Sequence, residues 1–353
     1  MAKTIQGPGL FISQFIGKEP PFNTLGGVAR WAVELGFKAL QIPVFAPGLT
    51  DIGGLSESDA IVAIEAILGA NGLMVSEISA HRAGQLLAVH PAYDDVMDAL
   101  ASPAVRGNPQ ARRKQAEHDL RRAISSSAAL GGRRVAVLSG GFAWPFFYPY
   151  PPHPAGLVAH AFEELAARWR PFLDEADRAG VDICFELHPG QDLHDGATFE
   201  RFLALVEHHP RAKILYDPSH MLLQHVDYLG FIDRYHQRIA AFHVKDAEFV
   251  PSASRGVYGG YADWLDRPGR FRSVGDGQIE FGAIFDRLTR YGYDGWAVLE
   301  WECCLKNAMD GAAEGARFIA NHIIRITEQP FDADMRQEGS LEAFDRILGL
   351  KRP

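Results

Sequence analysis

Short apolar runs alternate with amphipathic stretches along most of this chain. Eight of these runs are rich in Leu, Ile, Val, Ala and Phe without a strict polar alternation, which is typical of strands buried on both faces. Gly and Pro bound many of them, as expected at turns. We therefore predict strands over residues 10–15, 37–43, 73–79, 135–138, 181–185, 213–216, 239–244 and 296–299.

Between these strands, apolar residues recur three and four positions apart, which is the spacing of one helical face. Ser56 is a suitable N-cap for the second helical segment, and Asn71–Gly72 is a suitable terminator because both residues tolerate a left-handed backbone. We predict helices over residues 24–35, 56–71, 109–130, 156–179, 197–206, 231–237, 281–291 and 311–326.

The predicted elements follow one order, strand then helix, repeated eight times. Strand-helix-strand connections are nearly always right-handed, so such repeats build one parallel sheet. Eight of them favour a closed (β/α)8 TIM barrel, an α/β fold whose active site lies at the carboxyl ends of the strands. A doubly wound open sheet is the alternative, but no glycine-rich phosphate-binding sequence follows the first strand.

Three long segments without a regular pattern follow predicted strands. They cover residues 80–108, 140–154 and 248–276, and we expect long loops at the C-terminal face, the first with a short helix near 94–100. The second contains Trp144 and other aromatic residues among prolines, which suits a substrate wall or a subunit contact.

The length of 353 residues would suit one barrel or two ordinary domains. We predict a single barrel over residues 1–329. Residues 330–353 would then be a C-terminal extension, which packs as an extra helix or reaches a neighbouring subunit in a homo-oligomer.

Composition narrows the range of partners. The chain is 47% hydrophobic and 22% charged, as in an ordinary globular protein, and its net charge of -9 offers no general attraction to nucleic acid or anionic membranes. No signal-peptide pattern or long apolar span is present, so we expect a cytoplasmic protein. Three cysteines are too few for a disulfide framework, and the Cys303–Cys304 pair lacks the spacing of a zinc motif.

Metal-binding side chains end four consecutive predicted strands. They are Glu186, Asp217, His243 and Glu300. Because the carboxyl ends of barrel strands meet at one face, we expect these side chains to surround one divalent ion. Three carboxylates and one imidazole suit Mn²⁺ first, and also Mg²⁺, Co²⁺ or Zn²⁺.

Each of these residues also has a structural interpretation when taken alone. A glutamate at either position would pair with Lys245 or Arg272, Asp217 before Pro218 suits a turn, and a lone histidine is more often structural than a ligand. The coincidence of four such residues at equivalent strand ends favours the metal site. Glu302 shares a face with Glu300, so the two could exchange as ligand, and we favour Glu300.

The sequences at these strand ends also carry a family resemblance. The segments FELHPG, DPSH, FHVKDAE and VLEWE, with Gly275–Gly277 before an apolar pair, resemble the xylose-isomerase-like TIM barrels of the sugar (phosphate) isomerase/epimerase superfamily. The resemblance covers residues 10–327 and is strongest from residue 181 onward. Residues 78–86 resemble the loop after strand three in the same group.

The resemblance implies that Glu186, Asp217, His243 and Glu300 bind the metal, and that Glu186 and Glu300 also transfer the proton. It implies a group of substrate contacts around the mouth of the barrel, for some of which the residues also allow a structural role. An ion pair between Lys245 and Asp246, and a loop-stabilising Arg272, remain open. The predicted contacts are His81, His188, His220, Lys245, Arg272 and Trp144.

This site predicts a divalent-metal-dependent isomerase or epimerase that moves a proton through an enediolate of a ketose or keto-sugar. A lyase that cleaves a keto-glycoside by β-elimination is the alternative, with the aromatic loop facing the leaving group. A non-catalytic sugar-binding or assembly subunit is a third possibility. The related apurinic-site endonucleases need further ligands, whereas strand four here ends in Leu138–Gly141 without one.

Overall fold

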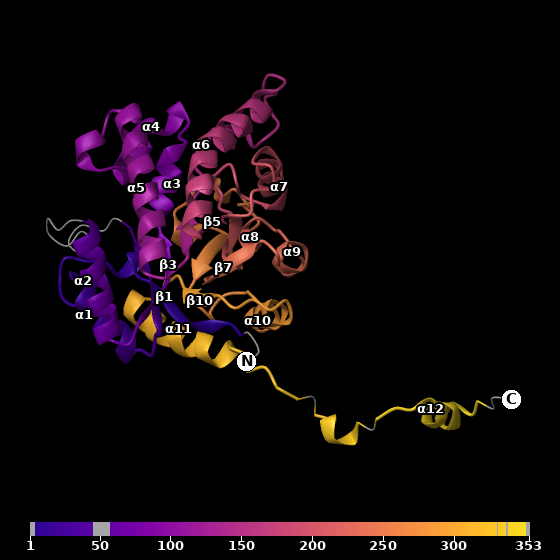
Figure 1. The fold of residues 1–353 in the computed structure, drawn as a ribbon. Coiled ribbons are helices and arrows are strands. Elements are labelled where there is room, and N and C mark those ends of the chain that lie inside the picture. The colour runs from indigo at the N-terminus through magenta and orange to yellow at the C-terminus, as the bar shows by residue number, and fades with distance from the viewer. Residues whose placement is uncertain (1–3, 45–56, 330, 337, 351–353) are drawn as a thin grey trace. The chain divides into compact units, whose positions relative to one another are not determined.

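The structure is a computed structural model that describes residues 4–44, 57–329, 331–336 and 338–350. Eight parallel strands close into a barrel, with helices around it (Figure 1). The strand order is β1-β10-β7-β6-β5-β4-β3-β2, which confirms the predicted (β/α)8 fold and excludes an open sheet. The barrel strands are β1 Gln6–Phe11, β2 Ala39–Pro43, β3 Met74–Ser79, β4 Arg134–Val137, β5 Asp182–Glu186, β6 Ala212–Tyr216, β7 Ile239–Val244 and β10 Trp296–Leu299.

Most of the predicted helices form where the apolar spacing places them. Capping residues set their ends. The Asn108 side chain accepts a hydrogen bond from Ala111 N at the start of α5, and Gly180 ends α6 with a φ of 68°. The predicted cap Ser56 lies outside the described residues. The helices are α1 Leu25–Glu34, α2 Glu57–Ala70, α3 His81–Leu87, α4 Asp94–Met97, α5 Pro109–Ala129, α6 Leu157–Ala179, α7 Gly196–Leu205, α8 Pro218–Leu223, α9 Tyr228–Tyr235, α10 Phe281–Arg290, α11 Ala308–His322 and α12 Leu341–Leu348.

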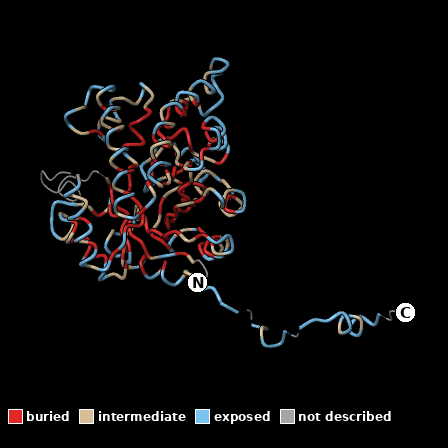
Figure 2. Tube along the Cα trace, viewed as in Figure 1, coloured by how far each residue is buried: buried red, intermediate tan, exposed pale blue. Residues whose placement is uncertain are grey.

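Two apolar layers hold the barrel together. Outward-facing strand residues pack against the helices, as where Phe185 lies edge-on to Trp169 of α6 with ring centroids 4.8 Å apart. Inward-facing residues such as Val298, Leu215 and Cys184 fill the barrel interior below the strand ends. Buried residues are concentrated in the barrel (Figure 2), so the strand ends rest on a close-packed support.

The chain departs from the predicted elements at the first strand and the first long loop. Strand β1 begins at Gln6 rather than at the predicted residue 10. The prediction started late because Gly7, Pro8 and Gly9 have the composition of a turn, but these residues form part of the strand. Helix α3 replaces the start of the predicted loop 80–108. Its Gly84 lowers helix propensity, but a methyl group there would lie 2.0 Å from the Leu138 carbonyl oxygen, so only glycine permits this packing.

The predicted loop 248–276 contains a hairpin that the sequence pattern did not indicate. Strands β8 Asp246–Phe249 and β9 Gly269–Arg272 pair antiparallel outside the barrel. The Asp246 carboxylate accepts hydrogen bonds from Gly275 N at 2.9 Å and Gly277 N at 3.0 Å. Asp246 therefore holds the glycine turn after the hairpin, and it does not form the considered ion pair with Lys245.

Residues 3–324 and 325–353 separate into two units by their internal contacts. The second unit contains the short turn Ala333–Met335 and α12, whose apolar side chains are exposed. The predicted boundary near residue 329 stays a prediction. In the part of the chain that the structure describes, no helix is long and apolar enough to cross a membrane.

Candidate metal centre

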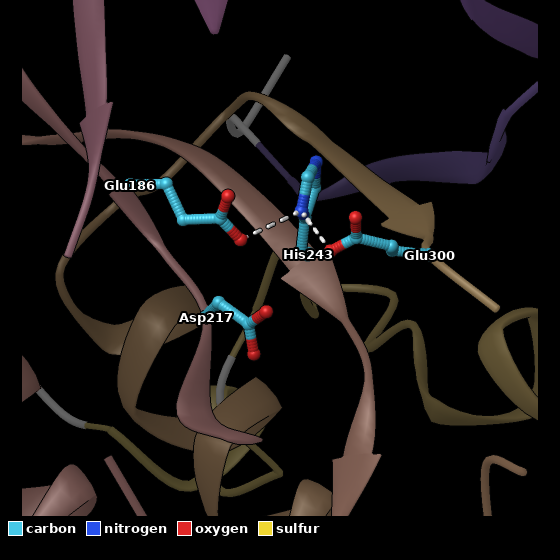
Figure 3. A group of neighbouring side chains, drawn as sticks. All are labelled: Glu186, Asp217, His243 and Glu300. Atoms are coloured by element: carbon cyan, nitrogen blue, oxygen red, sulfur yellow. Dashed lines mark hydrogen bonds and ion pairs between the residues drawn. The ribbon is translucent and has the colours of Figure 1, made fainter. Parts of the chain in front are cut away.

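The structure brings together the four side chains at the ends of β5, β6, β7 and β10 (Figure 3). One ligand atom from each of Glu186, Asp217, His243 and Glu300 lies within 4.8 Å of the others. All four residues are buried, with exposed fractions of 1–6%. Barrel closure therefore places residues more than a hundred positions apart around one small space.

A hydrogen bond to Gln41 orients the imidazole of His243. Its Nε2 lies 2.8 Å from Gln41 Oε1 on β2, while Nδ1 lies 2.8 Å from Glu300 Oε2 and 3.6 Å from Glu186 Oε1. Burial lowers the pKa of His243, but Glu300 and Glu186 outweigh it and raise the pKa to about 10, so the ring is protonated beside these carboxylates. Because the Gln41 carbonyl oxygen can only accept, Nε2 carries a hydrogen, and Nδ1 is the nitrogen that faces the carboxylates and would give up its proton to a cation. That is the orientation a metal-binding histidine requires.

Two carboxylate oxygens in the cluster lack hydrogen-bond partners among the described residues. Glu186 Oε1 and Asp217 Oδ2 are both buried. His220 Nε2 lies 3.4 and 3.3 Å from them but without the angles of a hydrogen bond. Buried, unpaired carboxylate oxygens are costly unless a cation offsets their charge, so these residues fit a hard or borderline divalent ion.

The charges around the cluster shift the pKa values of its carboxyl groups in opposite directions. Burial alone raises the pKa of Glu300, but Lys245 and His243 more than offset it and lower the pKa to about 2. The pKa of Glu186 is likewise held well below its usual value, because His220, His243 and His81 outweigh burial. Burial and the two charged glutamates instead raise the pKa of Asp217. Two carboxylates thus stay ionised, as a metal site and a general base require.

Lys245 is part of this cluster rather than of the loop. Its ammonium group is buried and lies 2.8 Å from Glu302 Oε2, 3.3 Å from Glu300 Oε2 and 3.7 Å from Asp217 Oδ2. Burial opposes its charge, but the carboxylates raise the pKa of Lys245 well above the usual value. Glu302 is 39% exposed and pairs with Lys245, whereas Glu300 points into the cluster.

Three of the predicted substrate residues are histidines beside the carboxylates. His81 Nε2 lies 3.3 Å from Glu186 Oε2, and its Nδ1 contacts Ser79 Oγ at 2.7 Å. His220 is fully buried, and burial together with the charges of His188 and Lys245 lowers its pKa to about 3. The ring centroids of His188 and His220 are 4.0 Å apart. These imidazoles therefore line one side of the cluster.

The other two predicted substrate residues lie in the loops. Trp144 stacks on Phe147 with ring centroids 4.9 Å apart. Arg272 on β9 donates to Glu248 across the hairpin, with a distance of 2.5 Å from Nη1 to Oε2. Neither has a described contact with the four clustered side chains, so their roles toward substrate stay predictions.

The family model described as xylose isomerase-like TIM barrel matches residues 29–322, which is most of the chain. The chain belongs to this family.

The solved structures include proteins that share the fold over nearly their whole length. 3-Keto-D-glucoside 4-epimerase from E. coli is 16% identical, with a TM-score of 0.61 over 89% of this chain and 98% of that one. A xylose isomerase-like TIM barrel protein from Mycobacterium smegmatis, in complex with magnesium, is 16% identical with a TM-score of 0.59, over 91% and 96% of the two chains.

Curated relatives include inosose dehydratases. The enzyme from Lacticaseibacillus casei is 28% identical over 146 residues, which are 40% of this chain and 47% of that protein. The chain thus spans about half the length of the curated relatives it matches. Enzymes named as epimerases and as dehydratases are both found among the relatives of this xylose isomerase-like barrel.

Sequence reasoning missed the polar residues that orient the predicted ligands. Gln41 contacts His243, and Gln14 Nε2 donates to Glu300 Oε1 at 3.1 Å. Gln41 is a polar residue near the end of an apolar strand, the same signal that identified the ligands. Gln14 follows β1 in a turn, where nothing in the local pattern indicates its direction.

Proposed function

We propose that this protein is a divalent-metal-dependent isomerase or epimerase of a ketose or keto-sugar. The observation that carries the proposal is the placement of Glu186 and Glu300, which both keep ionised carboxylates in a buried cluster and approach His243 Nδ1 from different strands. Two such carboxylates suit removal of a proton from one side of a carbon and its return from the other.

In this proposal Glu186, Asp217, His243 and Glu300 hold the ion. When bound there, a divalent ion would polarise the substrate carbonyl and lower the free energy of the enediolate formed beside it. The carboxylate-rich donor set is consistent with Mn²⁺ or Mg²⁺, and a relative of the same fold is described in complex with magnesium. We propose Mn²⁺ as the ion bound most effectively.

The protein groups around the cluster determine the path of the proton. Glu186 removes the proton next to the carbonyl, and His81, 3.3 Å from its other oxygen, holds the carboxylate in place. For epimerisation, Glu300 takes up a proton from solvent and delivers it to the opposite face of the same carbon, while Glu186 releases the proton that it removed. For isomerisation, Glu186 returns that proton to the adjacent carbon. Lys245 and His220 border the space where the substrate oxygens would lie.

A lyase is the second candidate, and the inosose dehydratase relatives favour it. The first step is the same: Glu186 removes the proton next to the carbonyl. The electron pair then forms a carbon-carbon double bond while the bond from the β-carbon to oxygen breaks. The leaving oxygen keeps the electron pair of the broken carbon-oxygen bond and takes up a proton, so water or an alcohol departs. The buried ammonium group of Lys245 is placed to donate this proton.

The proposal predicts that Glu186→Gln and Glu300→Gln each lower exchange of substrate protons with solvent at least about 100-fold, the usual contribution of a general base. The measurement is deuterium incorporation in D2O by mass spectrometry, with Mn²⁺-loaded protein and circular dichroism to verify folding. Gln115→Leu on α5 serves as the control, because the Gln115 side chain donates to Asp119 rather than to a member of the cluster. Exchange that persists in both glutamate variants would contradict the two-carboxylate scheme.

A panel of free ketoses, cyclic keto-polyols and keto-glycosides separates the candidate functions. Label incorporation with an unchanged carbon skeleton supports the epimerase or isomerase. Release of water or of the aglycone supports the lyase. Sugar binding without exchange or release, in metal-loaded protein, would instead support a non-catalytic sugar-binding subunit.

A further inference from the structure

Two long loops at the C-terminal face expose large aromatic side chains. We call these residues, together with the buried ring on which one of them packs, the aromatic strip. Its four upper members have exposed fractions of 49–62%, which is unusual for side chains of this size. The strip consists of Phe147, Tyr148, Tyr258, Trp264 and Phe271.

The upper part of the strip joins the two loops. The Tyr258 ring centroid is 5.9 Å from that of Phe147 and 6.2 Å from that of Tyr148. Trp144 stacks beneath Phe147, and the buried Asp192 carboxylate accepts the backbone N–H of Trp144 at 2.9 Å. A buried polar anchor therefore fixes the backbone at Trp144, on which Phe147 stacks.

The lower part of the strip reaches the candidate metal centre. Trp264 packs on Phe271 with ring centroids 4.7 Å apart, and Phe271 in turn meets the His220 ring at 5.3 Å. The Lys245 ammonium nitrogen lies 4.3 Å from the centre of the same Phe271 ring. A path of contacting rings thus runs from the cluster to solvent.

A single arginine links the two halves of the strip. The Arg267 guanidinium lies over Trp264, 5.4 Å from the ring centre. It also packs against the backbone next to Tyr258, where Gly259 has a φ of 73° and a methyl group would lie 2.5 Å from the guanidinium carbon. Only glycine fits this position without strain, so Gly259 itself fixes the backbone turn beside Tyr258.

We propose that the aromatic strip binds the planar aglycone of a keto-glycoside whose oxidised sugar ring lies at the metal cluster. This inference rests on the proposed function and names its substrate class. A free ketose would be accommodated by the polar cluster and would leave the strip exposed. A neutral planar ring gains from stacking on Trp264 and Tyr258, and it needs no group to offset a charge.

Binding without turnover provides the first test. The probes are 4-nitrophenyl β-D-glucopyranoside and methyl β-D-glucopyranoside, titrated calorimetrically into Mn²⁺-loaded full-length protein. We expect Trp264→Ala and Tyr258→Ala each to weaken binding of the nitrophenyl glycoside about 3- to 10-fold and to leave the methyl glycoside unchanged. Tyr261→Ala is the matched control, since Tyr261 belongs to the same loop and is fully exposed.

Equal affinity of the wild-type protein for both glycosides would overturn the inference, as would variants that weaken both equally. Sedimentation of the wild type and the same variants covers the remaining outcome. If the wild type sediments as an oligomer and the variants as monomers with an unchanged affinity ratio, the strip is an interface between copies. If circular dichroism shows that Trp264→Ala is unfolded, the test relies on Tyr258→Ala.

Turnover separates failure of this inference from failure of the proposed function. The substrates are the corresponding 3-keto-glycosides in D2O. No exchange with either glycoside would refute the proposed function for this substrate class. Proton exchange with both glycosides would support the proposed function. If Trp264→Ala then leaves the ratio of kcat/KM for the nitrophenyl glycoside to kcat/KM for the methyl glycoside unchanged, only the aglycone site is refuted.

Discussion

Single polar residues decide how the cluster can act, and Gln41 is the clearest example. It is completely buried, and its side-chain oxygen binds His243 Nε2–H and so keeps Nδ1 turned toward the carboxylates. A leucine of similar size would leave the imidazole free to turn and its Nε2–H without an acceptor. Gln41 is therefore a positioning residue that acts through His243.

We predict that Gln41→Leu weakens Mn²⁺ binding about 10- to 100-fold, the usual effect of losing a partner that orients a metal-binding histidine. Competition with a fluorescent chelator measures this without reference to activity. Gln115→Leu should have the affinity of the wild type. An unchanged affinity in Gln41→Leu would show that Gln41 does not orient the ring.

Glu77 on β3 is a buried carboxyl group that the proposed reaction does not use. It is 1% exposed, and neither of its oxygens has a hydrogen-bond partner among the described residues. Burial raises the pKa of Glu77 above its usual value, and the nearby Ser76 and Arg134 only partly oppose this. A folded-state pKa above the unfolded one means that the group stabilises the protonated folded protein, and that this contribution is lost as the pH rises through the folded pKa.

Glu77→Gln should therefore be more stable than the wild type at pH 8, and the difference should shrink toward pH 4.5. Urea unfolding of metal-free protein in EDTA at several pH values measures the two free energies of unfolding. A difference that is the same at both ends of this range would mean that Glu77 finds a partner for its charged form.

At the scale of elements, loops at the barrel mouth depend on polar anchors more than on apolar packing. The Asp192 carboxylate, between β5 and α7, accepts the backbone N–H groups of Phe142, Ala143 and Trp144 at 2.8–2.9 Å. Three donors on one buried carboxylate fix the start of a segment that has little regular structure of its own.

Asp192→Ala should lower the free energy of unfolding by about 2–4 kcal/mol, because buried donors lose a charged acceptor. It should also expose the loop near Trp144 to limited proteolysis. Asp227→Ala, which removes the exposed N-cap of α9, should cost only about 1 kcal/mol and leave that loop protected. Equal effects of the two substitutions would contradict the anchoring role.

At the scale of the whole molecule, barrel closure concentrates negative charge in one buried place. Strands β5, β6 and β10 each bring a carboxylate there, and Lys245 and the histidines offset only part of the charge. Binding of a cation should then stabilise the entire fold, because the unfolded chain has no such site.

Mn²⁺ at about 100 times its Kd should stabilise the protein by about 2.7 kcal/mol and raise the Tm by roughly 3–5 °C, and EDTA should reverse the shift. Differential scanning fluorimetry measures both. The double variant Glu186→Gln, Asp217→Asn should lose the shift. A shift that survives in this variant would place the ion elsewhere.

The sequence by itself determined the barrel and the four clustered side chains, because eight apolar strands and the polar residues at their ends leave a local signal. Tertiary structure alone decided the rest. Helix α3 and the β8–β9 hairpin form against weak local preference, since close packing at Gly84 and the buried anchor Asp246 outweigh it. Gln14 and Gln41 reach their partners only when the strands close into a ring, and no local pattern encodes a contact between residues so far apart in the chain.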